Sequence, residues 1–495
     1  MNLILFVLYS VLLFFGILNH EMWRDELEAW LVSINSSSLS DLLYNIKYEA
    51  HPPLWYIFLY TTGKFTKNPI AMQFLHLVIA CSVIFVFLKW APFNKIQKAL
   101  FCFGYFPFYE FAVISRSYSL ELLLIFIFCI LFKAQNKNYI LLSIILFLMS
   151  CTHVFGLFFA ICFQLLLIFE YFIYKKQNST NLFIGLFLFS LGLAYLANQL
   201  SLPEDSFYHI NLNYDFSLSK LLRTLGIVYK GFIPIPNLTY NFCDTNILMF
   251  LNQDLELLIS AILSCGLLIF SFLLFAKKPV PLFLYVIGNL IILTFTYLRF
   301  YGSLRQHGHL FILFIVCLWI STYYNEAASS KYKNIFIYFI LCCQLLGGIY
   351  AYTLDLFNPF SESKNASRFI KEQNLQDLFI IGSLDTHVFP ISAYLDRKIF
   401  YPGSGRYGTF VVWDKKVDAI VKPSVLFQVA VEAINQKNKN VLLILSNELI
   451  MHKDNNVLSL TLEWLNPNIK ISKLREFKNS IRGDENYYIY LAEKK

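Results

Sequence analysis

Long apolar runs separated by short polar segments fill most of residues 1–351. Runs long enough to cross a bilayer, alone or supported by neighbouring helices, lie at 3–18, 69–90, 98–114, 118–133, 139–152, 154–174, 182–200, 255–276, 280–298, 308–324 and 333–351. No basic segment precedes the first run and no small-residue cleavage site follows it, so we expect an uncleaved anchor. The pattern predicts a polytopic α-helical membrane protein of about eleven transmembrane helices.

Two shorter elements are predicted between the first two runs, in a loop at 19–68. A helical spacing of apolar residues predicts a short amphipathic helix on the membrane surface, carried by Leu39, Leu42, Leu43 and Ile46. Residues 53–65 are too few to cross and begin with two prolines, which favours an interfacial or re-entrant piece. Another long loop, at 201–254, contains several prolines and is expected to pack over the face of the protein on which the loop at 19–68 lies.

The pattern changes after residue 351, where helical and strand-like segments alternate. Helices are predicted at 364–373 and 423–435, and strands at 378–382, 441–447 and 487–492. The glycine-rich segment 403–408 does not join a clear strand to a clear helix, so we expect a turn and not a phosphate loop. The chain is therefore divided into a transmembrane domain at 1–351 and a soluble α/β domain at 352–495.

Composition excludes an ordinary soluble globule, because 57% of the 495 residues are hydrophobic and only 15% are charged. The net charge of +8 does not indicate a nucleic-acid partner, since the lysines lie in short clusters between apolar runs, as in cytoplasmic loops. If the N-terminus is cytoplasmic and 53–65 does not cross, all of these clusters fall inside: Lys89, Lys95 and Lys98, Lys133 and Lys137, Lys175 and Lys176, Lys277 and Lys278, Lys331 and Lys333. The acids, histidines and arginines near the other helix ends, and the C-terminal domain, then lie outside.

The loop at 19–68 carries the first candidate residues. Asp25 and Glu26 lie among large apolar side chains, and a carboxylate in a dry cleft has a raised proton affinity and can act as a general base. The alternative is a helix-end acid paired with Arg24. His51 precedes two prolines, which hold its backbone extended, so we expect it to cap a helix or to line the site as a metal ligand, proton partner or positioner of Asp25.

Further ionisable residues lie at the outer ends of other runs. Glu110, Arg116 and Glu121 flank one turn, and ions at a membrane edge indicate function by default, although an internal salt bridge of Arg116 with either acid is the alternative. His153 lies at an outer junction of two runs, where it either joins the site or satisfies a helix end.

A basic turn precedes the run at 308–324 and, on this topology, lies outside, against the positive-inside preference. It contains Arg299, Arg305, His307 and His309. Arginine binds phosphate with a planar fork of donors, so a lipid-linked phosphate at the bilayer edge is the expected ligand. General attraction to anionic head groups is the alternative.

Taken in order, these motifs resemble those of the GT-C membrane glycosyltransferases, in particular the bacterial relatives of protein O-mannosyltransferases and of the lipid A aminoarabinose transferase. The similar elements are Asp25-Glu26, His51-Pro52-Pro53-Leu54, Ser115-Arg116 with Glu121, Thr152-His153 with Phe155-Gly156, and Arg305. Glu121 departs from the family pattern, which usually has Asp. The resemblance covers about residues 1–350.

The resemblance implies inverting transfer of a sugar from a polyprenyl-phosphate donor to a lipid, glycan or protein acceptor at the outer face of a bacterial inner membrane. Asp25 and Glu26 would be catalytic, while Arg305, His307, Arg116 and Arg299 would bind the donor phosphate. Residues lining the site would be His51, Glu110, Glu121 and His153, with a divalent metal ion possible near Glu26 and His51. A polysaccharide polymerase or ligase is the alternative, and a transporter is less favoured because its ionisable residues usually lie near mid-membrane.

Overall fold

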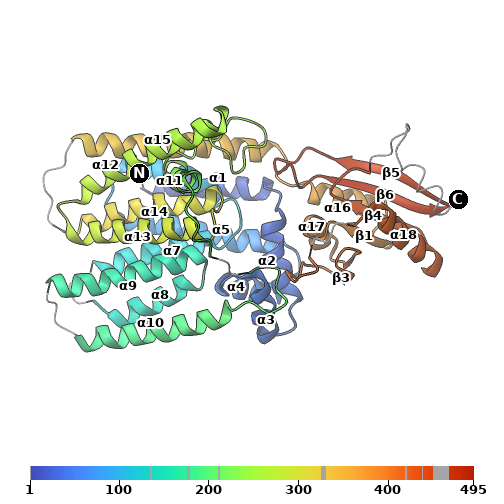
Figure 1. Cartoon of the computed structure of the whole chain (residues 1–495), viewed down its shortest axis with the longest axis horizontal. Coiled ribbons are helices and arrows are strands. Elements are labelled where there is room, and N and C mark those ends of the chain that lie inside the picture. Colours follow the sequence, from blue (N-terminus) through green and yellow to red (C-terminus); the bar gives the residue numbers. More distant parts are fainter. Residues whose placement is uncertain are drawn as a thin grey trace.

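Apolar helices build the larger part of the molecule, and a small sheet-containing domain extends from one end of it (Figure 1). The structure is a computed structural model that describes residues 2–133, 137–174, 179–209, 212–324, 331–417, 421–437, 439–449 and 468–495. Within these ranges eight helices are long and apolar enough to cross a membrane. They are α1 (Asn2–Asn19), α5 (Ile70–Trp90), α9 (Val154–Tyr174), α10 (Ser179–Gln199), α12 (Gln253–Phe275), α13 (Pro279–Leu298), α14 (Leu304–Ser321) and α15 (Lys331–Phe357). Two shorter apolar helices, α7 (Tyr118–Phe132) and α8 (Tyr139–Ser150), lie among them.

The predicted continuous helix at 98–114 is wrong. Helix α6 (Lys95–Cys102) ends before Gly104, and a single π-helical segment, η1 (Tyr105–Glu110), follows it. Pro107 lies inside this segment and has no N–H for a regular helical hydrogen bond. Helix α15 packs closely against this segment at Gly348, where a Cβ atom would lie 2.8 Å from the carbonyl oxygen of Phe103.

Helix α14 is the most enclosed of the long helices, because 94% of its residues are buried inside the protein. Glycines allow the close packing around it. A Cβ on Gly231 of α11 (Leu218–Phe232) would lie 2.4 Å from the carbonyl oxygen of His307, and one on Gly308 would lie 2.4 Å from the ring of Phe106. Contacts with protein thus replace contacts with lipid around the helix that carries Arg305 and His309.

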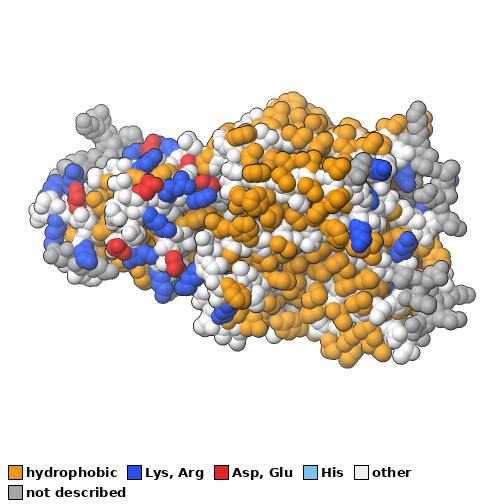
Figure 2. All heavy atoms as spheres, turned by 180° about the vertical axis from the view of Figure 1, so that it is seen from behind, with side chains coloured by type: hydrophobic (Ala, Val, Ile, Leu, Met, Phe, Trp, Pro, Cys, Tyr) orange, Lys and Arg blue, Asp and Glu red, His pale blue; other side chains and the backbone are white. Residues whose placement is uncertain are grey.

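A broad apolar surface surrounds the helical part (Figure 2). It contains large exposed side chains such as Val78, Phe187 and Ile262, which are 61% to 65% exposed. Hydrophobic surface on this scale is typical of an integral membrane protein. Basic side chains lie at the end of the bundle away from the sheet domain (Figure 2). The predicted cluster at Lys175 and Lys176 falls outside the described residues, as does the side chain of Lys331.

Three short helices lie between the bundle and the sheet domain: α2 (Arg24–Asn35), α3 (Leu39–Glu49) and α4 (Leu54–Gly63) (Figure 1). Helix α3 confirms the predicted amphipathic helix, since Leu42 and Ile46 are fully buried and Ser38 accepts a hydrogen bond from the N–H of Asp41 at 3.1 Å. Helix α4 has ten residues, too few to cross a bilayer, as predicted. The loop at 201–254 contains α11 and a 3₁₀ turn, η2 (Ile247–Phe250), neither of which was predicted.

The C-terminal domain has a six-stranded mixed sheet with the order β3-β2-β1-β4-β6-β5. Its elements are α16 (Ser363–Glu372), β1 (Phe379–Ser383), α17 (Asp385–Leu395), β2 (Ile399–Tyr401), β3 (Arg406–Gly408), α18 (Pro423–Lys437), β4 (Val441–Leu445), β5 (Ile469–Phe477) and β6 (Tyr487–Lys494). Strands β2, β1 and β4 are parallel, and the other pairings are antiparallel. All five predicted elements are present, while α17, β2, β3 and β5 were missed. In the glycine-rich segment 403–408, residues 403–405 belong to the turn that follows β2, and residues 406–408 form β3.

The close approach of α11 and α14 generates a stability prediction. Gly231→Ala puts a methyl group against backbone that cannot rotate away, so the two helices must separate. We expect the variant to lose about 1 to 3 kcal/mol of unfolding free energy. Gly266→Ala, on α12 with no atom within 4 Å of its Cβ, is the matched control. Thermal unfolding of both variants in detergent tests this, and equal melting temperatures would contradict the close contact.

Candidate functional site

Asp25 is bound by two arginines that come from distant parts of the chain. Its carboxylate lies 2.6 Å from Nη1 of Arg116, in the turn before α7, and 2.8 Å from Nη2 of Arg305, in the first turn of α14. The Asp25 side chain keeps 26% of its surface exposed, whereas the arginine side chains keep 13% and 18%. The three predicted residues therefore meet at one place, where the Asp25 side chain remains partly exposed.

The expected high proton affinity of Asp25 is wrong. Burial raises the pKa of this carboxyl, but Arg305 and Arg116, followed by Arg24 and Arg482, together hold the pKa below its usual value. Asp25 is therefore ionised at neutral pH. Several guanidinium groups around one carboxylate leave positive charge that can attract a further anion.

Arg482 belongs to the C-terminal domain and was not found from the sequence. Its guanidinium carbon lies 4.5 Å from the ring centre of Trp23, which also faces Arg305 at 5.2 Å and Arg24 at 5.8 Å. Cations bind favourably over an indole face. The Nε of Arg305 is buried without a hydrogen-bond partner, so this donor is available to a ligand. No local pattern marks Arg482, because its significance comes only from the elements that surround it.

Asp244, in the loop at 201–254, contacts both the start of α14 and Arg482. One carboxylate oxygen accepts a hydrogen bond from the N–H of Leu304 at 3.1 Å, at the start of α14, and the other lies 3.0 Å from Nη1 of Arg482. Burial raises the pKa of Asp244, but Arg305 and Arg482 lower it below the usual value. This aspartate thus anchors the helix that carries Arg305 to the C-terminal domain.

Glu26 is fully buried, and its carboxylate is used by protein donors. It accepts hydrogen bonds from the N–H of Ser115 at 2.6 Å and of Trp23 at 3.2 Å, and lies 2.9 Å from Nε2 of His20. The other ring nitrogen of His20 lies 2.7 Å from Asp355 in α15. Burial would lower the pKa of His20, but Asp355 and Glu26 raise it to about 10. Glu26 therefore joins three segments through a buried imidazolium, an arrangement that favours a structural role over proton transfer.

Two further acids are buried in this region: Glu28 in α2 and Glu49 at the end of α3. Burial, and then the neighbouring Glu49 carboxylate, raises the pKa of Glu28 well above its usual value. Burial likewise raises the pKa of Glu49 to about 8. The raised pKa values reduce the negative charge that this pair adds to the site.

His51 lies next to these acids, with Nδ1 2.5 Å from the carbonyl oxygen of Glu49. Burial, followed by the charge of Arg116, lowers the pKa of His51 to about 4, so the ring is neutral. Its ring centre is 6.1 Å from that of His153. Among the described residues, no group of three possible metal ligands contains Glu26 or His51. The structure therefore gives no support to a metal ion held by this pair.

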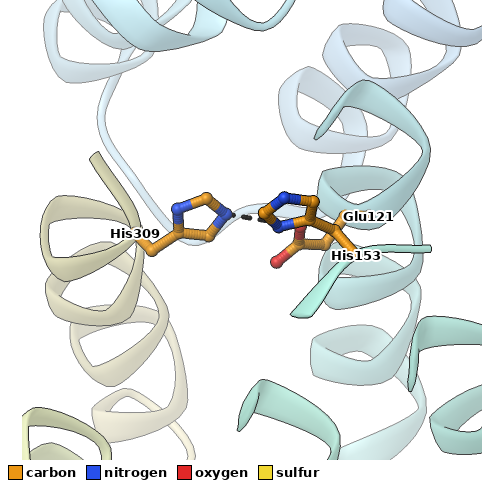
Figure 3. Close-up of side chains that lie close together, drawn as sticks. All are labelled: Glu121, His153 and His309. Atoms are coloured by element: carbon orange, nitrogen blue, oxygen red, sulfur yellow. Dashed lines mark hydrogen bonds and ion pairs between the residues drawn. The ribbon is translucent and has the colours of Figure 1, made fainter. Parts of the chain in front are cut away.

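A deeper cluster combines Glu121 of α7, His153 at the junction before α9, and His309 of α14 (Figure 3). Nε2 of His309 lies 3.3 Å from the Glu121 carboxylate. The hydroxyl of Tyr118 lies 3.4 Å from Nε2 of His153 and accepts a hydrogen bond from the side chain of Gln306 at 3.1 Å. Two of the four predicted site-lining residues, Glu121 and His153, therefore belong to one buried cluster with His309, next to Tyr118 and Gln306.

Other predicted residues have different partners. The predicted salt bridges of Arg116 with Glu110 or Glu121 are not formed; Glu110 accepts a hydrogen bond from the hydroxyl of Tyr105 at 2.9 Å. Nε2 of His307 lies 3.0 Å from the carbonyl oxygen of Tyr301. These contacts leave Glu110 and His307 outside the direct contacts of Asp25.

Arg299 also stands apart from the Asp25 arginines. Its guanidinium donates a hydrogen bond to the carbonyl oxygen of His209 at 2.7 Å. It lies at an apolar cavity of about 390 Å³ between α9 and α13, lined mainly by Phe158, Leu290, Ile291, Phe295 and Leu298. This combination of an apolar wall and one cation is suited to an amphipathic anion.

Neither a protein-family model nor a curated protein matches the chain. The fold itself defines a class: an integral membrane protein, mostly helical, with a small mixed sheet near its C-terminus. A partly open carboxylate surrounded by arginines lies where the helices meet the C-terminal domain. Any specific activity has to be argued from this site.

The different surroundings of Glu26 and Glu28 generate a second prediction. Glu26→Gln leaves the buried His20 imidazolium with Asp355 alone, and we expect a loss of about 3 to 5 kcal/mol of unfolding free energy. Glu28→Gln, on the same helix, replaces a carboxyl whose raised pKa already favours the neutral form, and should cost less than about 1 kcal/mol. Thermal unfolding in detergent at pH 7 compares them.

The pH dependence of the same melts provides a further check. The pKa of His20 rises from about 6.5 in the unfolded chain to about 10 in the folded one. Its stabilisation is therefore complete below pH 6.5 and is lost as the pH rises towards 10. This alkaline loss should be weaker in Glu26→Gln; equal stability and equal slopes in the two variants would contradict the structural role of Glu26.

Proposed function

We propose that the chain is an inverting glycosyltransferase that moves a sugar from a polyprenyl-phosphate carrier to a cell-envelope acceptor. The observation that carries this proposal is the partly exposed Asp25 side chain, whose carboxylate is held between Arg116 and Arg305 at the end of an apolar bundle. A general base next to phosphate-binding groups is what displacement of a lipid phosphate requires.

The donor phosphate binds to the arginines. Arg305 and Arg116 are permanently charged, and their planar forks match phosphate oxygens. The unpaired Nε of Arg305 supplies a further donor. The apolar cavity beside Arg299 supports binding of an isoprenoid tail, which would keep the phosphate near the membrane edge.

In the transfer step Asp25 accepts the proton of an acceptor hydroxyl or amine. The freed electron pair attacks the anomeric carbon from the face opposite the phosphate, and the bond between that carbon and the phosphate oxygen breaks. The configuration is inverted, and Arg305 and Arg116 stabilise the charge that develops on the leaving lipid phosphate.

The low pKa of Asp25 has a consequence for this step. With both arginines bound to it, the carboxylate is a weak base. A phosphate between Arg116 and Arg305 would share their charge, and the added negative charge would raise the pKa of Asp25. Donor binding therefore activates the base, which favours a reaction order with the donor bound first.

The acceptor side faces the C-terminal domain. A second cavity of about 390 Å³ is lined by Asn35 at the end of α2 and by Asp385, Lys398, Tyr401, Arg406 and Tyr407 of the C-terminal domain. Aromatic rings next to hydrogen-bonding groups suit a sugar-bearing acceptor. The acceptor would be a glycolipid, a polysaccharide or a protein.

We place the protein in a bacterial inner membrane, with its N-terminus in the cytoplasm and the site and C-terminal domain outside. This topology is supported by the basic side chains at the end of the bundle away from the sheet domain (Figure 2). Positive charges are concentrated in cytoplasmic loops of membrane proteins. A polyprenyl-phosphate sugar presented at the outer face would then reach Asp25 directly.

Asp25→Asn tests the proposed base. The amide cannot accept the acceptor proton, so we expect transfer from a purified polyprenyl-phosphate sugar to fall by about a hundredfold or more. Asp41→Asn, which changes a half-buried acid in the first turn of the neighbouring helix α3, is the matched control and should leave transfer intact. Release of the lipid phosphate in the presence of a cell-envelope glycolipid extract is the measurement. Unchanged turnover in Asp25→Asn would overturn the mechanism.

Arg482→Ala tests whether the C-terminal domain contributes to the donor site. Loss of one charge-assisted contact should raise the KM for the donor about tenfold, with a smaller change in kcat. Arg397→Ala removes an arginine on the surface of the same domain, where it pairs with the exposed Asp377, and serves as the control. An unchanged donor KM in Arg482→Ala would exclude this arginine from donor binding.

A further inference from the structure

The cluster of Glu121, His153 and His309 has a geometry that hydrogen bonding alone does not explain. All three side chains are buried, with exposures of 1%, 6% and 2%. One ligand atom from each lies within 4.8 Å of the others, and no other group of this kind is found among the described residues. Figure 3 shows His309 reaching from α14 towards Glu121 and His153, which approach from the opposite side.

The orientation of the His309 ring is set by its neighbours. Nδ1 lies 2.9 Å from the carbonyl oxygen of Gln306, which can only accept, so Nδ1 carries a hydrogen and donates it. Nε2 faces the Glu121 carboxylate at 3.3 Å. Two electron-pair donors this close together can share a proton or bind one metal ion.

The spacing fits a metal ion. Zinc bonds to nitrogen and oxygen of about 2.0 to 2.1 Å, arranged tetrahedrally, place two ligand atoms about 3.4 Å apart. The second oxygen of Glu121 is buried without a hydrogen-bond partner, and no Lys or Arg of the described residues forms an ion pair with this carboxylate. A buried carboxylate in this position needs a cation to offset its desolvation.

His153 can complete the ligand set. Its ring nitrogens lie 3.4 Å from the hydroxyl of Tyr118 and 3.3 Å from the N–H of Phe155, both long for hydrogen bonds. A shared ion requires the ring to move inwards by roughly 1 Å, and neither of these long contacts would oppose that shift strongly. The Gln306 carbonyl oxygen accepts a hydrogen bond from Nδ1 of His309 and so fixes the ring orientation, as backbone carbonyls commonly do for histidine ligands of metals.

We propose that Glu121, His153 and His309 bind one zinc ion, with the fourth position open to water. Two imidazoles and one carboxylate are a ligand set that zinc takes up when one position is left open. This site differs from the Glu26 and His51 pair suggested by the sequence.

The ion would position the arginines of the site. Glu121 follows Arg116 by five residues at the start of α7, and His309 follows Arg305 by one turn of α14. Zinc bound between α7 and α14 would therefore fix the two segments whose guanidinium groups bind Asp25. It has this effect through geometry and takes no part in the transfer step.

Zinc content of the full-length protein tests the site. The protein is purified in detergent, incubated with zinc sulfate, freed of excess metal and analysed by atomic emission. We expect about one zinc per chain in the unaltered protein and at least a tenfold weaker affinity in Glu121→Gln and in His309→Ala. His76→Ala, which removes a buried histidine of α5 outside the cluster, is the matched control and should keep the metal.

Cobalt substitution distinguishes loss of the site from loss of the fold. Co²⁺ in a site with nitrogen and oxygen ligands gives visible absorption bands that depend on geometry and not on activity. Glu121→Asp keeps a carboxylate and should retain the bands at higher cobalt concentration, while circular dichroism confirms that each variant is helical. Absence of zinc and cobalt binding in the unaltered protein, or equal binding in all variants, would overturn the site and leave a His309 to Glu121 ion pair. None of these readouts depends on the proposed transfer activity.

Discussion

The ion pairs of Asp25 with Arg116 and Arg305 are the interaction around which the rest of the site is arranged. An apolar bundle cannot solvate charges, so an ion at its edge must have a partner or remain open to water. Here three segments of the chain bring their charges to one point. The remaining exposure of Asp25 shows that this point is accessible, which distinguishes it from a closed structural salt bridge.

Neighbouring acids have opposite surroundings because successive residues of a helix point about 100° apart. Asp25 turns towards the arginines, whereas Glu26 turns into the protein, where the His20 imidazolium and backbone N–H groups enclose it. The buried group holds α2 in place and so fixes the direction of the open one. An acidic pair in the sequence thus separates into a group suited to chemistry and a group that supports it.

The C-terminal domain forms part of the wall of the site. Arg482 lies over Trp23 and pairs with Asp244, which also caps the start of α14. Arg24 is held in the same region, since its backbone N–H donates to Glu485 at 2.9 Å and its side chain pairs with Asp484. The domain is therefore linked to the helices by charged contacts at the point where the proposed donor phosphate would bind.

The sequence alone determined the features that depend on neighbouring residues. The length of the apolar runs identified the long helices, the short run at 53–65 was correctly read as too short to cross, and the sidedness of the lysines pointed to Asp25, Arg116 and Arg305 as members of one face. Only the tertiary structure decided what depends on residues far apart in the chain. These features include the lowered pKa of Asp25, the burial of Glu26 and the position of Arg482 over Trp23. Periodicity reports which face of an element is apolar, but the charge state of a group depends on the partners that folding brings to it.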